Sequence, residues 1–305
     1  MRTAVGTHGT RHSVEDLQKR VDAQQTLPTL LCDSAGCGVS VRFVPEHSRS
    51  QADQAAPVYV PAYITLSKGA EHQPGCRNDA PGRLQHIIAV GADSALLSAR
   101  NDGTHELQLL ILQQALKRGS AAAPGAAADT PLDGALCTLT ELLALRALCG
   151  NDALLASQLT LRLGKKKVEW SSFFYEQERY DDAWQRLGAT SAELPMALLG
   201  TVRSHRSPQP GAHYSSTYLN CEPKYQITDI ADRRDFYEIS VGHPDAAWLQ
   251  SYPVGAEIVM FGLWRQGRTT TASRPHPTDP RRSITSVTHK LALAPSFKRQ
   301  LALVG

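Results

Sequence analysis

Three cysteines and one histidine near the start of the chain have the types and spacing of a metal site. Four residues separate Cys32 from Cys37, and three separate His72 from Cys76. Thiolates and imidazoles are the donors that zinc prefers, and four of them complete a tetrahedron. Glycines on both sides of Cys37, and Pro74-Gly75 before Cys76, allow tight turns that aim the donors at one point. The sequence therefore predicts a zinc site made of these four residues.

The predicted zinc ion is structural, because four protein ligands leave no open position for a reacting water. It would stabilise the fold of a domain whose hydrophobic core is small. Two alternatives stay open: His47 is a rival for the histidine position, or the four residues are packing thiols and a surface histidine without a metal. The remaining cysteines, Cys137, Cys149 and Cys221, lie among apolar or strand residues, which is typical of packing thiols.

Short elements surround the predicted metal site. Ser13 and Asp16 form a capping box, which predicts a helix over 13–25 and an N-terminal helix or arm over 1–26. From residue 31 to 112, alternating or apolar runs indicate strands. Asn101-Asp102-Gly103 is a hairpin signal between expected strands at 96–100 and 106–112. We therefore expect a zinc-binding β-rich domain over 27–118.

An Ala/Gly/Pro-rich stretch over 119–134 predicts a linker, because it offers little side-chain surface to bury. A helical section over 135–195 should follow, with helices at 138–149, 152–163 and 173–187. The first two resemble a helix-turn-helix only superficially. The second is rich in Leu and Ala, which cannot read base edges, so an ordinary helical hairpin is expected.

Strand patterns return after Pro195. The expected strands are 196–204, 218–228, 236–241, 257–264 and 283–293, with a short helix at 245–251 between the third and fourth. This element order, with Gly200-Thr201-Val202 in the first strand and Val254-Gly255-Ala256-Glu257 before the fourth, resembles the OB-fold. The resemblance implies a five-stranded OB-like β-barrel over 196–305. The fold class expected for the chain is therefore α+β multidomain: a small zinc-bound β domain, a helical middle section and this barrel.

The resemblance also implies a surface for nucleic acid. In OB-folds, the loop between strands four and five and the face of strands two and three hold single strands. Here that loop spans 266–282, carries four arginines against Asp279 alone, and contains three prolines that discourage regular structure. Phe236 shares a face with Glu238, whereas Tyr237 points inward, so Phe236 is the better stacking candidate. The predicted nucleic-acid-binding residues are Phe236, Trp264, Arg265, Arg268, Arg274, Arg281, Arg282, Lys290, Lys165, Lys166 and Lys167. The alternative for the loop is a solvated tip without a ligand, and for the lysines a solvated turn.

Charge is unevenly distributed along the chain. The formal net charge is only +3, yet the segment from Trp264 to Gly305 holds eight basic residues and one acid. The rest of the chain therefore carries slightly more acids than bases. A basic strip on a slightly acidic body points to a polyanionic partner.

Other classes of protein fit less well. The sequence lacks the phosphate-binding, nucleophile-elbow, zinc-protease and deaminase motifs, so we do not expect an enzyme. No apolar run approaches the roughly 18 residues of a membrane span, and residues 1–25 lack the apolar core of a signal peptide. We expect a cytoplasmic protein with no membrane partner.

The expected function is non-catalytic binding of single-stranded DNA or RNA. By analogy, such a protein would be a subunit of a nucleoprotein complex with other proteins, of a replication or an RNA-guided defence type. One alternative is a protein-interaction scaffold with structural zinc. The other is a nuclease whose site is assembled across domains.

Overall fold

The computed structural model describes residues 1, 3–49, 58–60, 62–91, 96–121, 130–149, 152–189, 193–208, 216–228, 230, 232–276, 278–279 and 281–304. The chain is a mixed α+β protein with seven α-helices in this described part. It divides into two compact units. The first comprises Met1–His86 and Leu145–Asp152, and the second comprises Ile87–Ala144 and Ala153–Gly305.

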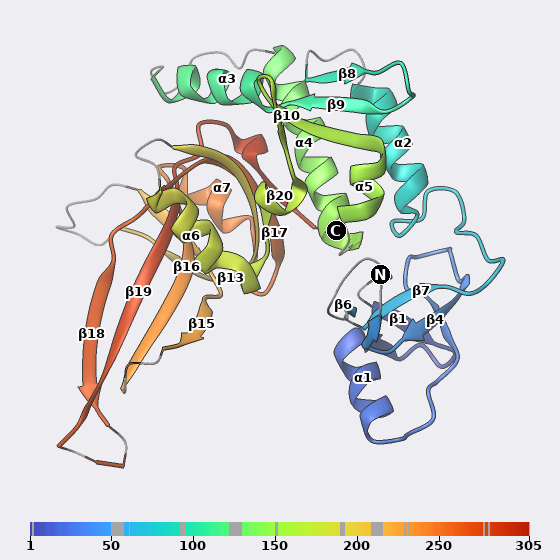
Figure 1. Cartoon of the computed structure of the whole chain (residues 1–305), viewed down its shortest axis with the longest axis horizontal. Helices are drawn as coiled ribbons and strands as arrows, with labels where there is room; N and C mark the ends of the chain where they lie inside the picture. The colour runs from blue at the N-terminus through green and yellow to red at the C-terminus, as the bar shows by residue number, and fades with distance from the viewer. Residues whose placement is uncertain are drawn as a thin grey trace. The chain divides into compact units, whose positions relative to one another are not determined.

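The first unit is built on a five-stranded antiparallel sheet in the order β2-β1-β3-β4-β7 (Figure 1). Its strands are β1 (Thr3–Gly6), β2 (Arg11–Ser13), β3 (Leu30–Cys32), β4 (Ser40–Val44) and β7 (Tyr63–Leu66). A separate pair is formed by β5 (His47–Arg49) and β6 (Val58–Val60). Helix α1 (Val14–Asp22) begins at the predicted capping box of Ser13 and Asp16. Its buried Leu17 joins Val41, Phe43 and Ile64 in a small core that also contains three cysteines.

Helix α2 (Ala80–Gly91) leads into the first part of the second unit, a four-stranded sheet in the order β11-β10-β9-β8. Its strands are β8 (Leu97–Ala99), β9 (His105–Gln108), β10 (Leu159–Leu163) and β11 (Lys166–Val168). Its helices are α3 (Leu109–Ala121), α4 (Thr130–Cys149) and α5 (Asp152–Gln158). The antiparallel pairing of β8 with β9 confirms the predicted Asp-Gly hairpin. The second strand of that hairpin ends earlier than expected, because α3 begins at Leu109.

Two predicted helices are wrong in part. The expected helix over 152–163 stops at Gln158, where the chain enters β10 and pairs in parallel with β9. Its last residues alternate buried Leu159 and Leu161 with Thr160, a period-two pattern that favours a strand. The expected helix over 173–187 begins only with α6 (Tyr180–Gly188). Two 3₁₀ turns and the short strand β12 (Phe174–Tyr175) precede it.

The predicted linker over 119–134 lies between two observed helices. Helix α3 extends through Ala121 and α4 begins at Thr130, so both ends of the stretch are helical. Residues 122–129 lie outside the described residues, and the domain boundaries remain predictions. In the described part of the chain, no helix combines the length and apolarity that crossing a membrane demands.

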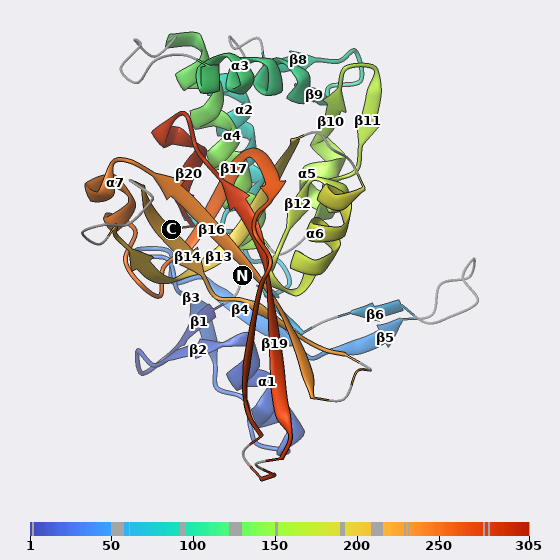
Figure 2. The ribbon, with the colours of Figure 1, turned by 90° about the vertical axis from the view of Figure 1, so that its left-hand side faces the viewer.

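Five strands of the second unit close into a barrel (Figures 1 and 2). They are β13 (Leu194–Arg206), β14 (Thr217–Cys221), β16 (Arg233–His243), β17 (Glu257–Gln266) and β19 (Ser283–Leu293). Around the barrel the order is β13-β14-β16-β19-β17, and β17 pairs with β13 again. Strands β16 and β19 run parallel, and the other four neighbouring pairs run antiparallel. The expected five-stranded barrel is therefore present.

Further short elements extend the barrel. Strand β12 joins β13, β15 (Lys224–Ile227) joins β16, β18 (Thr270–Pro275) joins β19, and β20 (Leu301–Leu303) joins β17. Helix α7 (Ala246–Gln250) is the short helix expected between the third and fourth strands. Helix α6 packs against β16, β17 and β19, and its buried Tyr180 and Leu187 belong to the barrel core with Trp264.

A glycine in β13 permits close packing inside the barrel. A Cβ at Gly200 would lie 2.8 Å from both the Tyr180 hydroxyl and the Cys221 sulfur. That separation is shorter than real Cβ contacts, so a larger residue would push α6 or β14 away. Gly200, part of the pattern behind the OB-fold resemblance, thus permits the close approach of α6 and β14 to β13.

The connection between β17 and β19 contains a strand, although its prolines are expected to discourage regular structure there. Strand β18 pairs with β19 from Thr270 to Pro275, and all its side chains are exposed. Proline is tolerated there because β18 is an edge strand. Figures 1 and 2 show β18 and β19 extending together beyond the rest of the barrel.

Candidate functional site

The four predicted metal ligands come together in the first unit. One donor atom from each of Cys32, Cys37, His72 and Cys76 lies within 4.8 Å of all the others. The sulfurs of Cys32 and Cys76 are 3.6 Å apart. His72 Nδ1 lies 3.5 Å from the Cys37 sulfur and 3.4 Å from the Cys76 sulfur. His47 is not part of this cluster, and its Nδ1 lies 3.0 Å from the carbonyl oxygen of Pro45.

These separations match a tetrahedral ion. Bonds of about 2.3 Å to sulfur and about 2.0–2.1 Å to nitrogen place two sulfurs about 3.8 Å apart, and sulfur and nitrogen about 3.6 Å apart. The observed distances of 3.4–3.6 Å fall close to these values. Three of the six donor separations thus suit a tetrahedral ion and the others do not exceed 4.8 Å, so the four side chains lie close enough together to bind one metal ion.

Two turns aim the ligands at a common point. Gly36 and Gly38 have φ angles of +76° and +56°, in the left-handed region that residues with a Cβ rarely adopt. They reverse the chain on either side of Cys37, while Cys32 lies at the end of β3. Gly75, with φ +78°, has the same role before Cys76. The turns predicted from the sequence are thus present.

The surroundings of Cys32 and Cys37 shift the pKa values of these two thiols in opposite directions. Burial raises the pKa of Cys32 to about 11. Burial also opposes ionisation of Cys37, but hydrogen bonds from the Gln73 backbone and the His72 side chain outweigh it and lower the pKa to about 6. Of these two thiols, Cys37 is therefore the more ready to become a thiolate, the form that binds metal.

A polar network lies behind the ligands. The carboxylate of Asp33 accepts hydrogen bonds from Thr3, Arg11, Arg77 and Asn78. Its side chain is only 2% exposed. Burial opposes its ionisation, but the hydrogen bonds from Thr3, Asn78 and Arg11 and the charge of Arg77 outweigh burial and lower its pKa. The sequence reasoning missed this network, although Asp33 and Asn78 each lie next to or near a predicted ligand.

The other three cysteines do not join the cluster. Cys221 is fully buried in the barrel core, and burial raises the pKa of its thiol. Burial also raises the pKa values of Cys137 and Cys149, which are partly exposed. Raised pKa values keep all three as neutral thiols. Cys221 packs in the barrel core, and for the partly exposed Cys137 and Cys149 the packing role stays a prediction.

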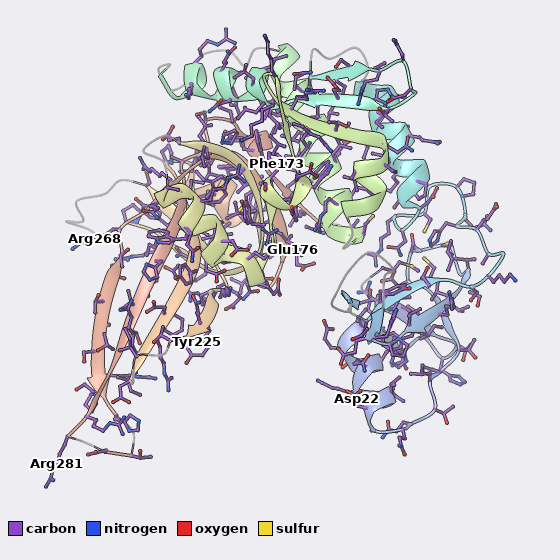
Figure 3. All side chains as sticks on the ribbon, viewed as in Figure 1. Asp22, Phe173, Glu176, Tyr225, Arg268 and Arg281 are labelled. Atoms are coloured by element: carbon purple, nitrogen blue, oxygen red, sulfur yellow. The ribbon has the colours of Figure 1, made fainter. Side chains whose placement is uncertain are left out.

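Most of the predicted basic residues lie on or near the β18–β19 hairpin. Some are free to contact a ligand, and others are already paired within the protein. Arg265, Arg268, Arg274 and Arg281 are exposed. Figure 3 shows Arg268 near the start of β18 and Arg281 near the far end of the hairpin. Arg282 is held by Asp232 through two hydrogen bonds of 2.8 Å.

The sheet register gathers another set of residues on the outer face of the barrel. In β16, Tyr237 and Ile239 belong to the core, so Phe236 and its alternate neighbours Arg234 and Glu238 face outward. This confirms the expected orientation of Phe236 and Tyr237. Phe236 is in register with Tyr225 of β15, and the two ring centroids are 5.4 Å apart.

Thr288 of β19 lies beside Phe236, and Thr270 of β18 lies beside Thr288, so a row of side chains crosses four strands. Tyr225, labelled in Figure 3, is 47% exposed. The sequence analysis did not single it out, although its pairing with Phe236 requires only the register of β15. On the same face, Glu238 lies 2.7 Å from Arg203 and 3.3 Å from the predicted residue Lys290.

Trp264 cannot stack on a base, which corrects the sequence prediction. Its side chain is 0% exposed, and its indole N–H donates a hydrogen bond to the Met196 carbonyl at 3.0 Å. The reason is strand alternation: Ile258, Met260 and Trp264 all face the core from β17. Trp264 stabilises the barrel and leaves Arg265 as its outward neighbour.

Lys165, Lys166 and Lys167 lie in the exposed turn between β10 and β11 and at the start of β11. Lys167 pairs with Glu169 at 3.1 Å. Figures 1 and 2 show this hairpin and the β18–β19 hairpin at opposite ends of the second unit. The lysines therefore do not extend the arginine surface.

Comparison with known proteins adds no family assignment. No family model matches the sequence, and no curated protein matches it either.

Proposed function

We propose that this protein binds single-stranded nucleic acid on the outer face of its C-terminal barrel, as a non-catalytic subunit of a nucleoprotein complex. The observation that carries the proposal is the row formed by Tyr225, Phe236, Thr288 and Thr270, which is flanked by cationic side chains. Single-strand binding needs aromatic faces for the bases and cations for the phosphates. Both kinds of group occur together here.

The charge of the face supports a polyanionic ligand. Among the outward positions of β16 and β19 that the structure describes, Glu238 is the one acid, and two cations already neutralise it. Arg234 from β16, together with exposed Arg274 and Arg281 from the hairpin, adds positive charge. Such a surface attracts phosphates and weakens its hold as salt rises.

The strand order supports an OB-like identity for the barrel. Numbered along the chain, its strands run 1-2-3-5-4 around the barrel, with the third and fifth parallel and a helix after the third. The β18 hairpin then occupies the connection between strands four and five, where OB-folds hold oligonucleotides. Phe236 lies on the third strand, and Tyr225 lies on β15, which follows the second strand along the chain and pairs with the third. Such folds use the face of their second and third strands.

We propose structural zinc as the metal of the N-terminal cluster. Three thiolates and one imidazole form a donor set that suits zinc, and four protein ligands close the site to substrate water. The module would be available for contacts with protein partners in the complex.

The decisive experiment is salt-dependent binding of labelled single strands of DNA and RNA, followed by fluorescence anisotropy. The double variant Arg274→Ala/Arg281→Ala should bind more weakly. Its slope of log affinity against log salt should fall by up to about 1.4, or about 0.7 for each lost phosphate contact. Lys117→Ala, which removes an exposed cation of α3 in the same unit, is the matched control and should leave the slope unchanged.

Two outcomes would contradict the proposal. Equal affinity and slope in the wild type and the double variant would show that the hairpin does not contact the nucleic acid. No binding of any oligonucleotide at low salt would favour the alternative function, a protein-interaction scaffold.

A further inference from the structure

The amide side chain of Asn78 lies between the metal ligands and the buried Asp33. Its Nδ2 is 3.2 Å from the Cys32 sulfur and 2.8 Å from Asp33 Oδ1. Its backbone N–H points at the Cys76 sulfur, 3.4 Å away. One residue that is not itself a ligand therefore contacts two of the three thiols.

The orientation of this amide is determined by its neighbours. An amide nitrogen has two hydrogens, and here one can point at the sulfur and the other at the carboxylate. If the amide were flipped, its oxygen would face two acceptors, the carboxylate and the thiolate, and both contacts would be repulsive. Asp33 thus selects the orientation in which Asn78 donates to Cys32.

Asp33 is itself held in place from several sides. Thr3 of β1, Arg11 of β2 and Arg77 all donate to its Oδ2. This leaves Oδ1 for Asn78. The carboxylate is thereby fixed to the first two strands of the sheet, and it transmits that rigidity to the amide.

The charge of a loaded site explains why such a donor matters. Three thiolates and a neutral imidazole around a divalent cation leave a net charge of −1. Hydrogen bonds from N–H groups to the sulfurs spread this charge and orient the ligands, and loss of such outer contacts typically weakens metal binding. Asn78 supplies two of these donors.

We infer that Asn78 is a positioning residue of the metal centre, and that Asp33 acts on the metal through Asn78. The inference rests on the proposed metal site. It extends that site from four ligands to a network that includes β1 and β2. A divalent cation with tetrahedral preference is the ligand that the network serves.

The test uses the full-length protein loaded with Co²⁺, which reports tetrahedral thiolate coordination in its absorption spectrum. Affinity is measured by competition with a chromogenic chelator. Asn78→Ala should weaken cobalt binding by about 10- to 100-fold and shift the thiolate-to-cobalt charge-transfer band. Asn78→Asp should weaken it more, because a carboxylate oxygen would face the thiolate. Gln25→Ala, which removes an exposed amide elsewhere in the first unit, should behave as wild type.

The role of Asp33 is tested by a double-mutant cycle with Asp33→Asn. If Asp33 acts through Asn78, Asp33→Asn should weaken binding alone but add little to Asn78→Ala. Additive losses would overturn that part of the inference. Wild-type affinity and an unshifted band in both Asn78 variants would overturn the rest.

Failure of the inference can be distinguished from failure of the metal site. If the wild-type protein binds neither Co²⁺ nor Zn²⁺, the metal site is wrong and the inference falls with it. If the wild type binds and the Asn78 variants bind equally well, only the inference is wrong. Far-UV circular dichroism checks that each variant is folded, and Asn78→Ala remains informative if Asn78→Asp does not fold.

Discussion

At the scale of single residues, burial separates the aromatic side chains that hold the barrel together from those that can meet a ligand. Trp264 and Tyr225 both have large ring surfaces, but Trp264 is 0% exposed and Tyr225 is 47% exposed. Base stacking requires a free ring face, so Tyr225 and its partner Phe236 qualify, whereas Trp264 does not.

The stacking role predicts a clear effect at Tyr225. Tyr225→Ala should weaken binding of single-stranded oligonucleotides by about 1–3 kcal/mol, the typical contribution of one stacked base. Tyr225→Phe keeps the ring and should bind nearly as the wild type does. Fluorescence anisotropy at fixed salt measures both. If the two variants lose the same affinity, the hydroxyl and not the ring makes the contact.

At the scale of elements, pairing between strands determines where the chemistry lies. Strands β15 and β18 are short additions to the barrel, yet they align Tyr225 and Thr270 with residues of β16 and β19. The opposite face of β16 and β19 carries a buried carboxylate. Asp235 of β16 is bound to Arg233 at 2.8 Å and lies 3.6 Å from His289 of β19.

The Asp235 pair predicts a pH dependence of stability. The Arg233 hydrogen bond is the main cause of the lowered pKa of Asp235, with the charges of Arg233 and His289 adding to it and burial opposing it. A lowered pKa in the folded state means that the ionised carboxylate stabilises the fold at pH values above its ordinary pKa of about 3.9. It is lost as the pH falls through the folded pKa.

Asp235→Asn should therefore lose less unfolding free energy than the wild type when the pH is lowered from 6 to below about 4. Urea unfolding at both pH values measures the difference. Glu193→Gln, an exposed carboxylate of the same unit, is the control and should follow the wild type. An equal loss in Asp235→Asn and the wild type would contradict the assigned role.

At the scale of the whole molecule, the two units have different sources of stability. The core of the first unit is small and includes Cys32, Cys37 and Cys76. The barrel core is larger and is built from residues such as Trp264, Tyr180 and Met260. A metal ion should therefore matter much more to the first unit.

Removal of zinc is expected to unfold one unit and spare the other. With a zinc chelator at neutral pH, limited proteolysis should cut readily within residues 1–86, while the barrel strands stay resistant. Mass spectrometry of the fragments locates the cuts, and added zinc should restore the protection. Equal protection of both units with and without chelator would contradict a structural metal.

The sequence by itself determined the features that depend on local chemistry. The Cys/His cluster, the turns at Gly36, Gly38 and Gly75, the Ser13 cap and the Asp-Gly hairpin all follow from residue type and spacing. The positions of β13, β16, β17 and β19 also follow from the strand patterns after Pro195, whereas the expected strand over 218–228 is divided into β14 and β15.

Only the tertiary structure decided which of these residues face a partner. Burial of Trp264, capture of Arg282 by Asp232 and the alignment of Tyr225 with Phe236 depend on strands that are distant in sequence. Strand β18 pairs with β19 despite Pro275, because an edge position tolerates it. The position of Asn78 between Cys32 and Asp33 joins segments more than 40 residues apart. Spacing along the chain predicts which nearby residues could act together. Strand pairing and burial across the fold determine what those residues contact.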